Sequence, residues 1–195
     1  MMFDLPCVLF AGGKSSRMGE DKALLPFGGF ETLAEFQYTR LRQLFSRVYL
    51  GAKSDSKFAF DADIILDPEG ADFAPTAGFV GAFTLLEDDR IMVLSVDTPF
   101  VGEKVFASLI AADHEKLDAV IARTPSGTHP MCGIYHRSLL DEIERMLREG
   151  DHRLGKLLSA SATRYVMFEE EESFANLNHP HEYREAYDRY RSENG

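Results

Sequence analysis

A glycine-rich segment near the amino terminus combines the residue types that bind phosphate. It reads AGGKSSRMGEDK, and its adjacent glycines let the chain turn tightly and expose N–H groups to an anion. Lys14, Arg17 and Lys22 add three positive charges within nine residues of a chain whose net charge is −11. A solvated turn would explain the glycines alone, but the three cations favour a polyphosphate-binding loop.

Two common phosphate-binding loops do not fit this segment. A Walker A loop needs a glycine five positions before Gly13, where Val8 stands, and Lys14 interrupts the GxGxxG pattern of dinucleotide-binding loops. The residue types therefore predict a polyphosphate site without identifying the nucleotide.

Two aspartates follow short apolar runs. Asp97 follows IMVLSV, and its carboxylate suits Mg²⁺, which prefers oxygen ligands and offsets charge in phosphoryl transfer. Asp67 follows IIL in the same way, and its carboxylate can accept hydrogen bonds from a ligand. The structural alternatives are turns that open at Asp97 before Pro99 and at Asp67 before Pro68.

The elements that must position these residues alternate along the chain. Apolar runs predict strands at residues 7–11, 48–50, 64–66, 91–96 and 119–122. Helical spacing predicts helices near residues 33–45, 79–86, 105–110 and 139–147. Thr32 and Glu35 form a capping-box pattern, and Ser138 and Gly150 are expected to cap the last of these helices. The alternation predicts βαβ units around a mostly parallel sheet, whose ligands bind beyond the carboxyl ends of the strands.

Composition excludes several protein classes. With 195 residues, 45% hydrophobic and 27% charged, the chain fits one globular domain rather than a disordered or fibrous protein. Its acidity, 21 Lys+Arg against 32 Asp+Glu, argues against binding to duplex nucleic acid. Cys7 and Cys132 form no CxxC motif, and no apolar run approaches the ~20 residues that span a membrane. A cytoplasmic protein without a membrane partner is expected.

The glycine-rich segment resembles the AGG-x-S-x-RMG-x-DK signature of the molybdenum cofactor guanylyltransferases (MobA family). The resemblance implies one three-layer α/β/α Rossmann-like nucleotidyltransferase domain over residues 1–195, with a mostly parallel, mixed sheet. Its nucleotide-binding half would span 1–100 and its pterin-binding half 101–195. The implied catalytic residues are Arg17 and Lys22, which neutralise the triphosphate, and Asp97, which holds Mg²⁺. The implied nucleotide contacts are Phe10, Ala11, Gly12, Gly13, Lys22, Asp67, Gly78, Asp97, Asn176 and Asn178.

Later motifs extend the resemblance to nearly the whole chain. The sequence PTAGFVG, which contains Gly78, resembles the Gly-Pro-Leu-Ala-Gly loop of the family, although helix–sheet packing explains its small residues equally well. Asn176 and Asn178 resemble the family's NxNTPE segment, where an Asn can complete the Mg²⁺ shell, but Asn178 could instead cap the last helix. His129 before Pro130 could contact the pterin phosphate or finish a turn.

Some positions depart from the family pattern or stay open. Phe10 stands where most relatives have Leu, Gly51 where a polar residue is common, and His179 where Thr is usual. His152 and Arg153 lie where relatives carry basic residues, either facing the pterin or at a solvated helix start.

The resemblance implies transfer of GMP from GTP to the phosphate of Mo-molybdopterin, with Mg²⁺ as cofactor and pyrophosphate as the second product. Other molybdenum cofactor biosynthesis proteins and acceptor molybdoenzymes are the implied protein partners. The alternatives are a CTP-dependent molybdopterin cytidylyltransferase, a sugar-phosphate nucleotidyltransferase, or a non-catalytic nucleotide-binding partner that delivers the cofactor.

Overall fold

The computed structural model describes residues 2–12, 21–71 and 74–194, and these form one seven-stranded sheet flanked by helices. The strands are β1 (Cys7–Phe10), β2 (Val48–Ala52), β3 (Ile64–Leu66), β4 (Arg90–Ser95), β5 (Ala119–Thr124), β6 (Gly127–His136) and β7 (Thr163–Met167). The helices are α1 (Leu33–Leu41), α2 (Pro75–Leu85), α3 (Glu103–Ala112), α4 (Leu140–Glu149), α5 (Leu154–Ser159) and α6 (Pro180–Asn194). Three short 3-10 helices are η1 (Lys22–Leu24), η2 (Arg137–Leu139) and η3 (Glu171–Phe174).

The sheet is mixed and mostly parallel, as the sequence predicts. Its strand order is β3-β2-β1-β4-β6-β5-β7, and only β6 runs antiparallel to its neighbours. The chain leaves β1 to build β2 and β3 on one side and returns to place β4 on the other. This reversal of strand order lies between β1 and β4, where ligands of open α/β sheets bind.

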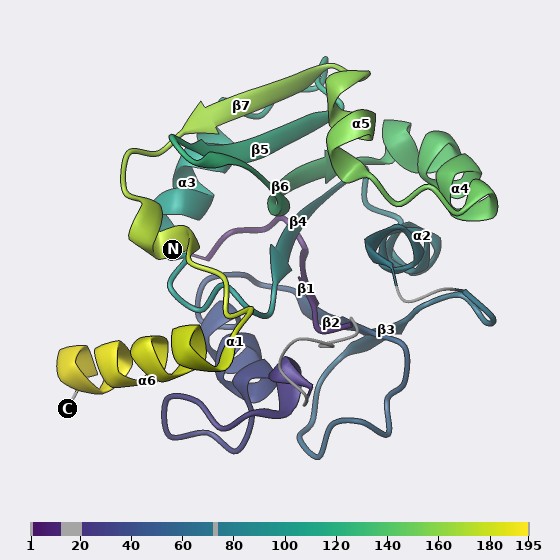
Figure 1. The fold of residues 1–195 in the computed structure, drawn as a ribbon. Coiled ribbons are helices and arrows are strands. Elements are labelled where there is room, and N and C mark those ends of the chain that lie inside the picture. Colours follow the sequence, from purple (N-terminus) through teal and green to yellow (C-terminus); the bar gives the residue numbers. More distant parts are fainter. Residues whose placement is uncertain (1, 13–20, 72–73, 195) are drawn as a thin grey trace.

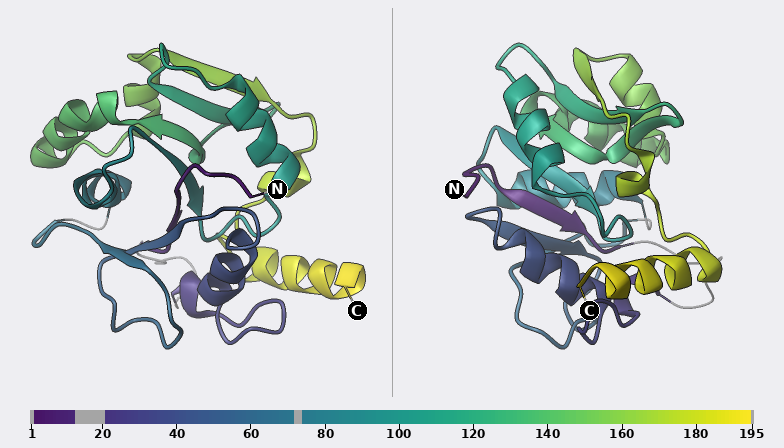
Figure 2. Two further views of the ribbon diagram at one scale, coloured as in Figure 1. Left: turned by 180° about the vertical axis from the view of Figure 1, so that it is seen from behind. Right: turned by 90° about the vertical axis from the view of Figure 1, so that its left-hand side faces the viewer.

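Helices cover both faces of the sheet (Figure 1). One face packs against α2, α4 and α5, and the other packs against α1 and α3. Helix α6 lies beside α1 in both views of Figure 2, and ring contacts such as Phe36 against Tyr190 (5.1 Å) join the two helices. The arrangement is the predicted three-layer fold, and strands from both halves of the chain share the one sheet.

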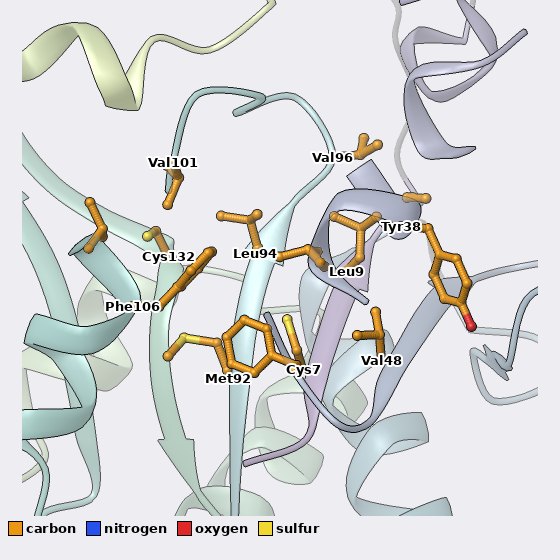
Figure 3. Packing of buried hydrophobic residues seen from close by; sticks show 14 of the residues in the cluster. Cys7, Leu9, Tyr38, Val48, Met92, Leu94, Val96, Val101, Phe106 and Cys132 are labelled. Carbon is orange, nitrogen blue, oxygen red and sulfur yellow. The ribbon is translucent and has the colours of Figure 1, made fainter. Parts of the chain in front are cut away.

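The core between the sheet and the α1/α3 layer is continuous and apolar (Figure 3). Leu9 and Leu94 on neighbouring strands pack toward Phe106 of α3, and all three are fully buried. Burying side chains of this kind stabilises a fold by about 1.5–3 kcal/mol each. Cys7 and Cys132 belong to the same core as free thiols, and burial raises the pKa of Cys132 to about 12. They are therefore packing residues rather than reactive groups.

Helix caps agree with the sequence in part. The Thr32 hydroxyl accepts a hydrogen bond from Glu35 N (3.1 Å), and Gly150 ends α4 with a φ of +67°. The prediction that Ser138 caps the same helix is wrong, because a 3-10 turn precedes it and moves the N-cap to Leu139. The Ser138 hydroxyl instead donates to Asp118 Oδ1 (2.6 Å).

Two strands were not predicted, β6 and β7. Strand β6 contains His129 and Pro130, so this pair lies within a strand rather than at a turn. Strand β7 forms an edge of the sheet, and its mixture of polar and apolar residues is half exposed, which hides the strand pattern. None of the described helices is long and apolar enough to cross a membrane.

Candidate active site

The carboxyl ends of β1 and β4 bring the predicted residues to one edge of the sheet. Ala11 directly follows β1, and its N–H donates to Gly51 O (2.9 Å) at the end of β2. Gly12 beyond it is exposed, and a Cβ on it would meet no atom of the described residues within 4 Å. This open end of β1 lies next to the end of β4, which leads to Asp97.

Three polar side chains from distant parts of the sequence meet at this edge. The Lys22 ammonium of η1 donates to Asp97 Oδ2 (2.6 Å) and to Asn178 Oδ1 (3.1 Å). The lysine side chain is 17% exposed and the aspartate side chain 13%, so water screens the ion pair only partly. Ser95, the last residue of β4, donates from its hydroxyl to Asp97 Oδ1 (2.6 Å) and fixes the carboxylate. We refer to Lys22, Asp97 and Asn178 as the carboxyl-edge cluster.

The segment before α6 delivers Asn178 to this cluster. Leu177 N donates to the backbone carbonyl of Asp97 (3.0 Å) and joins the segment to the turn after β4. The Glu182 carboxylate accepts from the N–H groups of Asn178 (2.7 Å) and His179 (2.8 Å). Glu182 therefore satisfies the start of α6, and the suggestion that Asn178 caps this helix is wrong, because its amide oxygen faces Lys22.

A cavity of about 250 Å³ opens beside Asp97. It is lined by Ser95, Asp97, Thr98, Thr128, His129, Pro130, Met131, Cys132, Phe174, Asn176 and Asn178. The His129 ring stacks on Phe174 (4.6 Å between centroids) and bonds the Thr124 hydroxyl (3.0 Å). Burial lowers the pKa of His129, and Glu171 opposes this effect only in part. The ring is thus neutral near pH 7 and offers this cavity a hydrogen-bonding group rather than a charge.

Asp67 and Gly78 lie apart from the carboxyl-edge cluster. Asp67 follows β3, three strand positions from β4, which is roughly 14 Å at the usual strand spacing. Burial raises the pKa of its carboxyl group, and the charge of Lys53 opposes this rise. A Cβ at Gly78 would lie 2.4 Å from the Phe10 ring, which also packs on Phe79 (5.1 Å between centroids). Gly78 therefore permits close helix–sheet packing, and the Phe10 ring belongs to the core.

The structure settles the surroundings of two further basic residues. The His152 ring bonds the buried Thr76 hydroxyl in the first turn of α2 (2.7 Å). Arg153 is solvent-exposed and pairs with Asp151 (2.7 Å). It occupies the N-cap position of α5 and does not line the cavity. Gly13 and Arg17, both predicted site residues, lie outside the described residues.

Sequence reasoning missed Lys57. This residue lies between β2 and β3, and its ammonium donates to Ala11 O (2.8 Å) and pairs with Asp21 Oδ2 (2.5 Å). It follows no strand end and belongs to no motif. The aromatic residues Phe58 and Phe60, which anchor its loop to α1, were the available signal.

The oxygen atoms of the carboxyl-edge cluster suit a hard cation. Within the described residues no group of three or more His, Cys, Asp or Glu side chains could hold a metal by itself. Asp97 Oδ2 and Asn178 Oδ1 nevertheless converge on one cation, the Lys22 ammonium. One carboxylate and one amide oxygen fit Mg²⁺, which usually takes its other ligands from water and phosphate.

Comparisons with known proteins show which family this chain belongs to. Residues 7–165 match the family described as MobA-like NTP transferase domain. The molybdenum cofactor guanylyltransferase of Campylobacter jejuni subsp. jejuni serotype O:6 is 35% identical over 191 residues, 97% of each chain. The protein of the same name from Helicobacter pylori J99 is also 35% identical, over 90% of this chain and 84% of the relative.

A solved structure supports the fold independently. The molybdopterin-guanine dinucleotide biosynthesis protein A of Archaeoglobus fulgidus superposes with a TM-score of 0.81, covering 96% of this chain and all of that one. Their sequence identity is 20%, so this likeness concerns the fold alone. The family match over residues 7–165 and the relatives that cover nearly the whole chain show that this chain belongs to the MobA-like NTP transferase family.

Proposed function

We propose that this protein transfers the GMP group of GTP to the phosphate of Mo-molybdopterin, producing molybdopterin guanine dinucleotide and pyrophosphate. The observation that carries the proposal is the convergence of Lys22, Asp97 and Asn178 at the strand-order reversal. Relatives covering nearly the whole chain carry the corresponding name.

The nucleotide would lie along the carboxyl edge of the sheet. Its triphosphate would follow Ala11 and Gly12 toward Lys22, whose charge compensates a ligand that the acidic protein would otherwise repel. Its base would lie toward β3, where Asp67 could accept from the guanine edge. Arg17 and Gly13 would contribute to the same phosphate site.

The cavity beside Asp97 would receive the phosphate end of the acceptor. Thr128 and Asn176 line it with polar groups, and neutral His129 could orient a phosphate oxygen. A phosphate oxygen of the acceptor attacks the α-phosphorus of GTP. The new P–O bond forms as the bond from the α-phosphorus to the β-bridging oxygen breaks, and pyrophosphate leaves with that electron pair. Because a phosphate monoester is already anionic, no general base is needed.

Asp97 and Asn178 would hold Mg²⁺, with Asn176 beside them. When bound, this ion would supply positive charge against the α-phosphate and the departing pyrophosphate. The residues of the chain act mainly by positioning and by electrostatic stabilisation, which is the usual division of work in phosphoryl transfer.

The deciding experiment measures pyrophosphate release with Mo-molybdopterin, Mg²⁺ and either GTP or CTP. Dominant turnover of GTP is expected. Dominant turnover of CTP would identify a cytidylyltransferase, and release only with sugar phosphates would identify that class of transferase. Binding of GTP without pyrophosphate release under any of these conditions would favour a non-catalytic delivery partner.

Other expectations stay predictions. These are the division of the chain near residue 100, the cytoplasmic location, and contacts with other molybdenum cofactor biosynthesis proteins and acceptor molybdoenzymes.

A further inference from the structure

Lys57 connects two segments at the carboxyl edge of the sheet, where the proposed nucleotide site lies. Its ammonium donates to the carbonyl of Ala11, directly after β1 (2.8 Å). The same ammonium pairs with Asp21 Oδ2, directly before η1 (2.5 Å). One cation thus holds the end of the central strand against the start of the element that carries Lys22.

The loop around Lys57 is held firmly from the other side. The rings of Phe58 and Phe60 pack together (5.8 Å between centroids), and Phe60 packs on Tyr38 of α1 (5.9 Å). The Tyr38 hydroxyl accepts a hydrogen bond from Asp63 N (3.0 Å). The Lys57 side chain is only 19% exposed, so it is part of this packed arrangement and not a solvated surface lysine.

Asp21 links Lys57 to the 3-10 helix that carries Lys22. Its Oδ1 accepts from Ala23 N (3.0 Å) as the N-cap of η1, while its Oδ2 pairs with Lys57. Lys22 is the first residue of η1, and its ammonium reaches Asp97. The contacts therefore run without interruption from the β2–β3 loop to the carboxyl-edge cluster.

We propose that Lys57 is a positioning residue, which acts through Asp21 to aim Lys22 at Asp97. Its effect on turnover rests on the proposed function, whereas its effect on Lys22 does not. Because Ala11 O and Asp21 occupy its ammonium, Lys57 serves catalysis through protein contacts rather than by touching substrate.

The first test compares Lys57→Met with Lys57→Arg and with Lys104→Met, a control at an exposed position on α3. Misplacing a catalytic group by a small distance lowers rates by roughly tenfold to a hundredfold. We expect that loss in kcat/KM for GTP in Lys57→Met, partial recovery in Lys57→Arg and no loss in the control. Wild-type kcat/KM in a folded Lys57→Met protein would overturn the proposal.

A double-mutant cycle tests the route through Asp21. Asp21→Asn keeps an oxygen for the cap on Ala23 N but removes the charge that pairs with Lys57. If Lys57 acts through Asp21, kcat/KM of the double variant should be no lower than that of the less active single variant. If the loss of kcat/KM in the double variant equals the product of the two single losses, Lys57 acts independently of Asp21 and the proposal is overturned. Asp21→Asn alone also keeps the test usable if Lys57→Met fails to fold.

A labelling experiment needs no turnover. Brief acetylation of amines, followed by mass spectrometry, reports how accessible the Lys22 ammonium is. Its reaction rate should rise at least twofold in Lys57→Met and Asp21→Asn and stay unchanged in Lys104→Met, because a Lys22 ammonium that no longer pairs with Asp97 is more exposed to the reagent. An unchanged rate in the first two variants would overturn the proposal. A wild-type protein that releases no pyrophosphate would overturn the proposed function while this measurement still judges Lys57.

Discussion

Two aspartates lie at opposite ends of the strands, and each contacts two other side chains, but different parts of the fold hold the two groups in place. At the carboxyl edge, Asp97 contacts Lys22 and Ser95, with Lys22 and Asn178 contributed by segments outside the sheet. At the amino edge, Asp113 contacts Arg90 (2.6 Å) and His136 (2.8 Å), which face each other in the β4–β6 register. Sheet pairing fixes Arg90 and His136, and Asp113 reaches them from the C-cap of α3, whereas the first group depends on loops and helix starts. We refer to Asp113, Arg90 and His136 as the amino-edge cluster.

The larger cavity does not lie beside Asp97. The larger hollow, about 500 Å³, lies beside the amino-edge cluster and is lined partly by Arg90, His136 and Arg137. Arg137 there donates to Phe83 O (2.8 Å) at the end of α2 and to Leu86 O and Asp88 O, so its charge closes a helix end. The smaller cavity adjoins Asp97. Position relative to the carboxyl ends of parallel strands is therefore the better guide to function.

The largest expected effect is that of Asp97→Asn. The variant should fold, because the amide oxygen can accept from Lys22 while the amide NH2 donates to the Ser95 hydroxyl oxygen. Turnover should fall by roughly a thousandfold, as when a principal electrostatic group is lost. Pyrophosphate release and thermal unfolding measure the two effects. Retention of a tenth of the activity would mean that the active site lies elsewhere, and Asp97 would then have no functional role that Asp113 lacks.

Lys22→Met should have the next largest effect. Loss of its charge from an acidic protein should lower kcat/KM for GTP by about a hundredfold, with a weaker dependence on salt than in the wild type. Steady-state kinetics at two ionic strengths measure both. Lys104→Met at the exposed position on α3 is the matched control. An equal loss in the control would show that overall charge, not the carboxyl-edge cluster, attracts the nucleotide.

Asp113→Asn should reverse this pattern. Its side chain is 2% exposed, and the change leaves the buried His136 ring and the exposed Arg90 without a charged partner, which should lower the free energy of unfolding by about 1–3 kcal/mol. Turnover per folded molecule should stay near the wild-type value. Denaturant unfolding and kinetics on the same sample separate the effects, and an activity loss without a stability loss would contradict a structural role.

Asp67→Asn should have the smallest effect on stability. Burial raises the pKa of Asp67, so the folded state binds its proton more tightly than the unfolded state does. Stability therefore falls as the pH rises from the unfolded pKa through the folded pKa, and the charge is unfavourable above both. The variant should gain less than about 1 kcal/mol at pH 7, because the group is partly exposed, and the gain should vanish in acid.

Unfolding across a pH series checks that expectation. Weaker GTP binding in the same variant would support contact with the base. A stability gain that persists in acid would mean that charge burial is not its cause.

The sequence was sufficient for the parts of the fold that depend on uniform patterns. Residues Cys7–Phe10 of β1 and Ile91–Leu94 of β4 are all apolar because both faces of these strands are covered, and Asp97 follows β4 at the candidate site. Strand β7 escaped prediction because it is a half-exposed edge, and the 3-10 turn before α4 displaced Ser138 from its expected cap.

Contacts made through tertiary structure could not be predicted. Nothing local indicates that Asn178 faces Lys22, 156 positions away, instead of capping its own helix. The small residue at Gly78 was consistent with close helix–sheet packing. Its packing partner, the Phe10 ring, could be identified only from the tertiary structure. Lys57 belongs to no periodic pattern, and its partners at Ala11 and Asp21 are defined only by the folded backbone.

The reversed direction of β6 has an evolutionary consequence. Because β6 alone runs against its neighbours, its residues Thr128–Cys132 lead to the end of β4 and line the cavity beside Asp97, and the short turn from Thr124 to Gly127 directly precedes them. Under the proposed function, in which this cavity receives the acceptor, insertions or exchanges in that hairpin would change acceptor choice without altering β1, η1 or the strand register. The same scaffold can therefore acquire new acceptors while inheriting its nucleotide machinery unchanged.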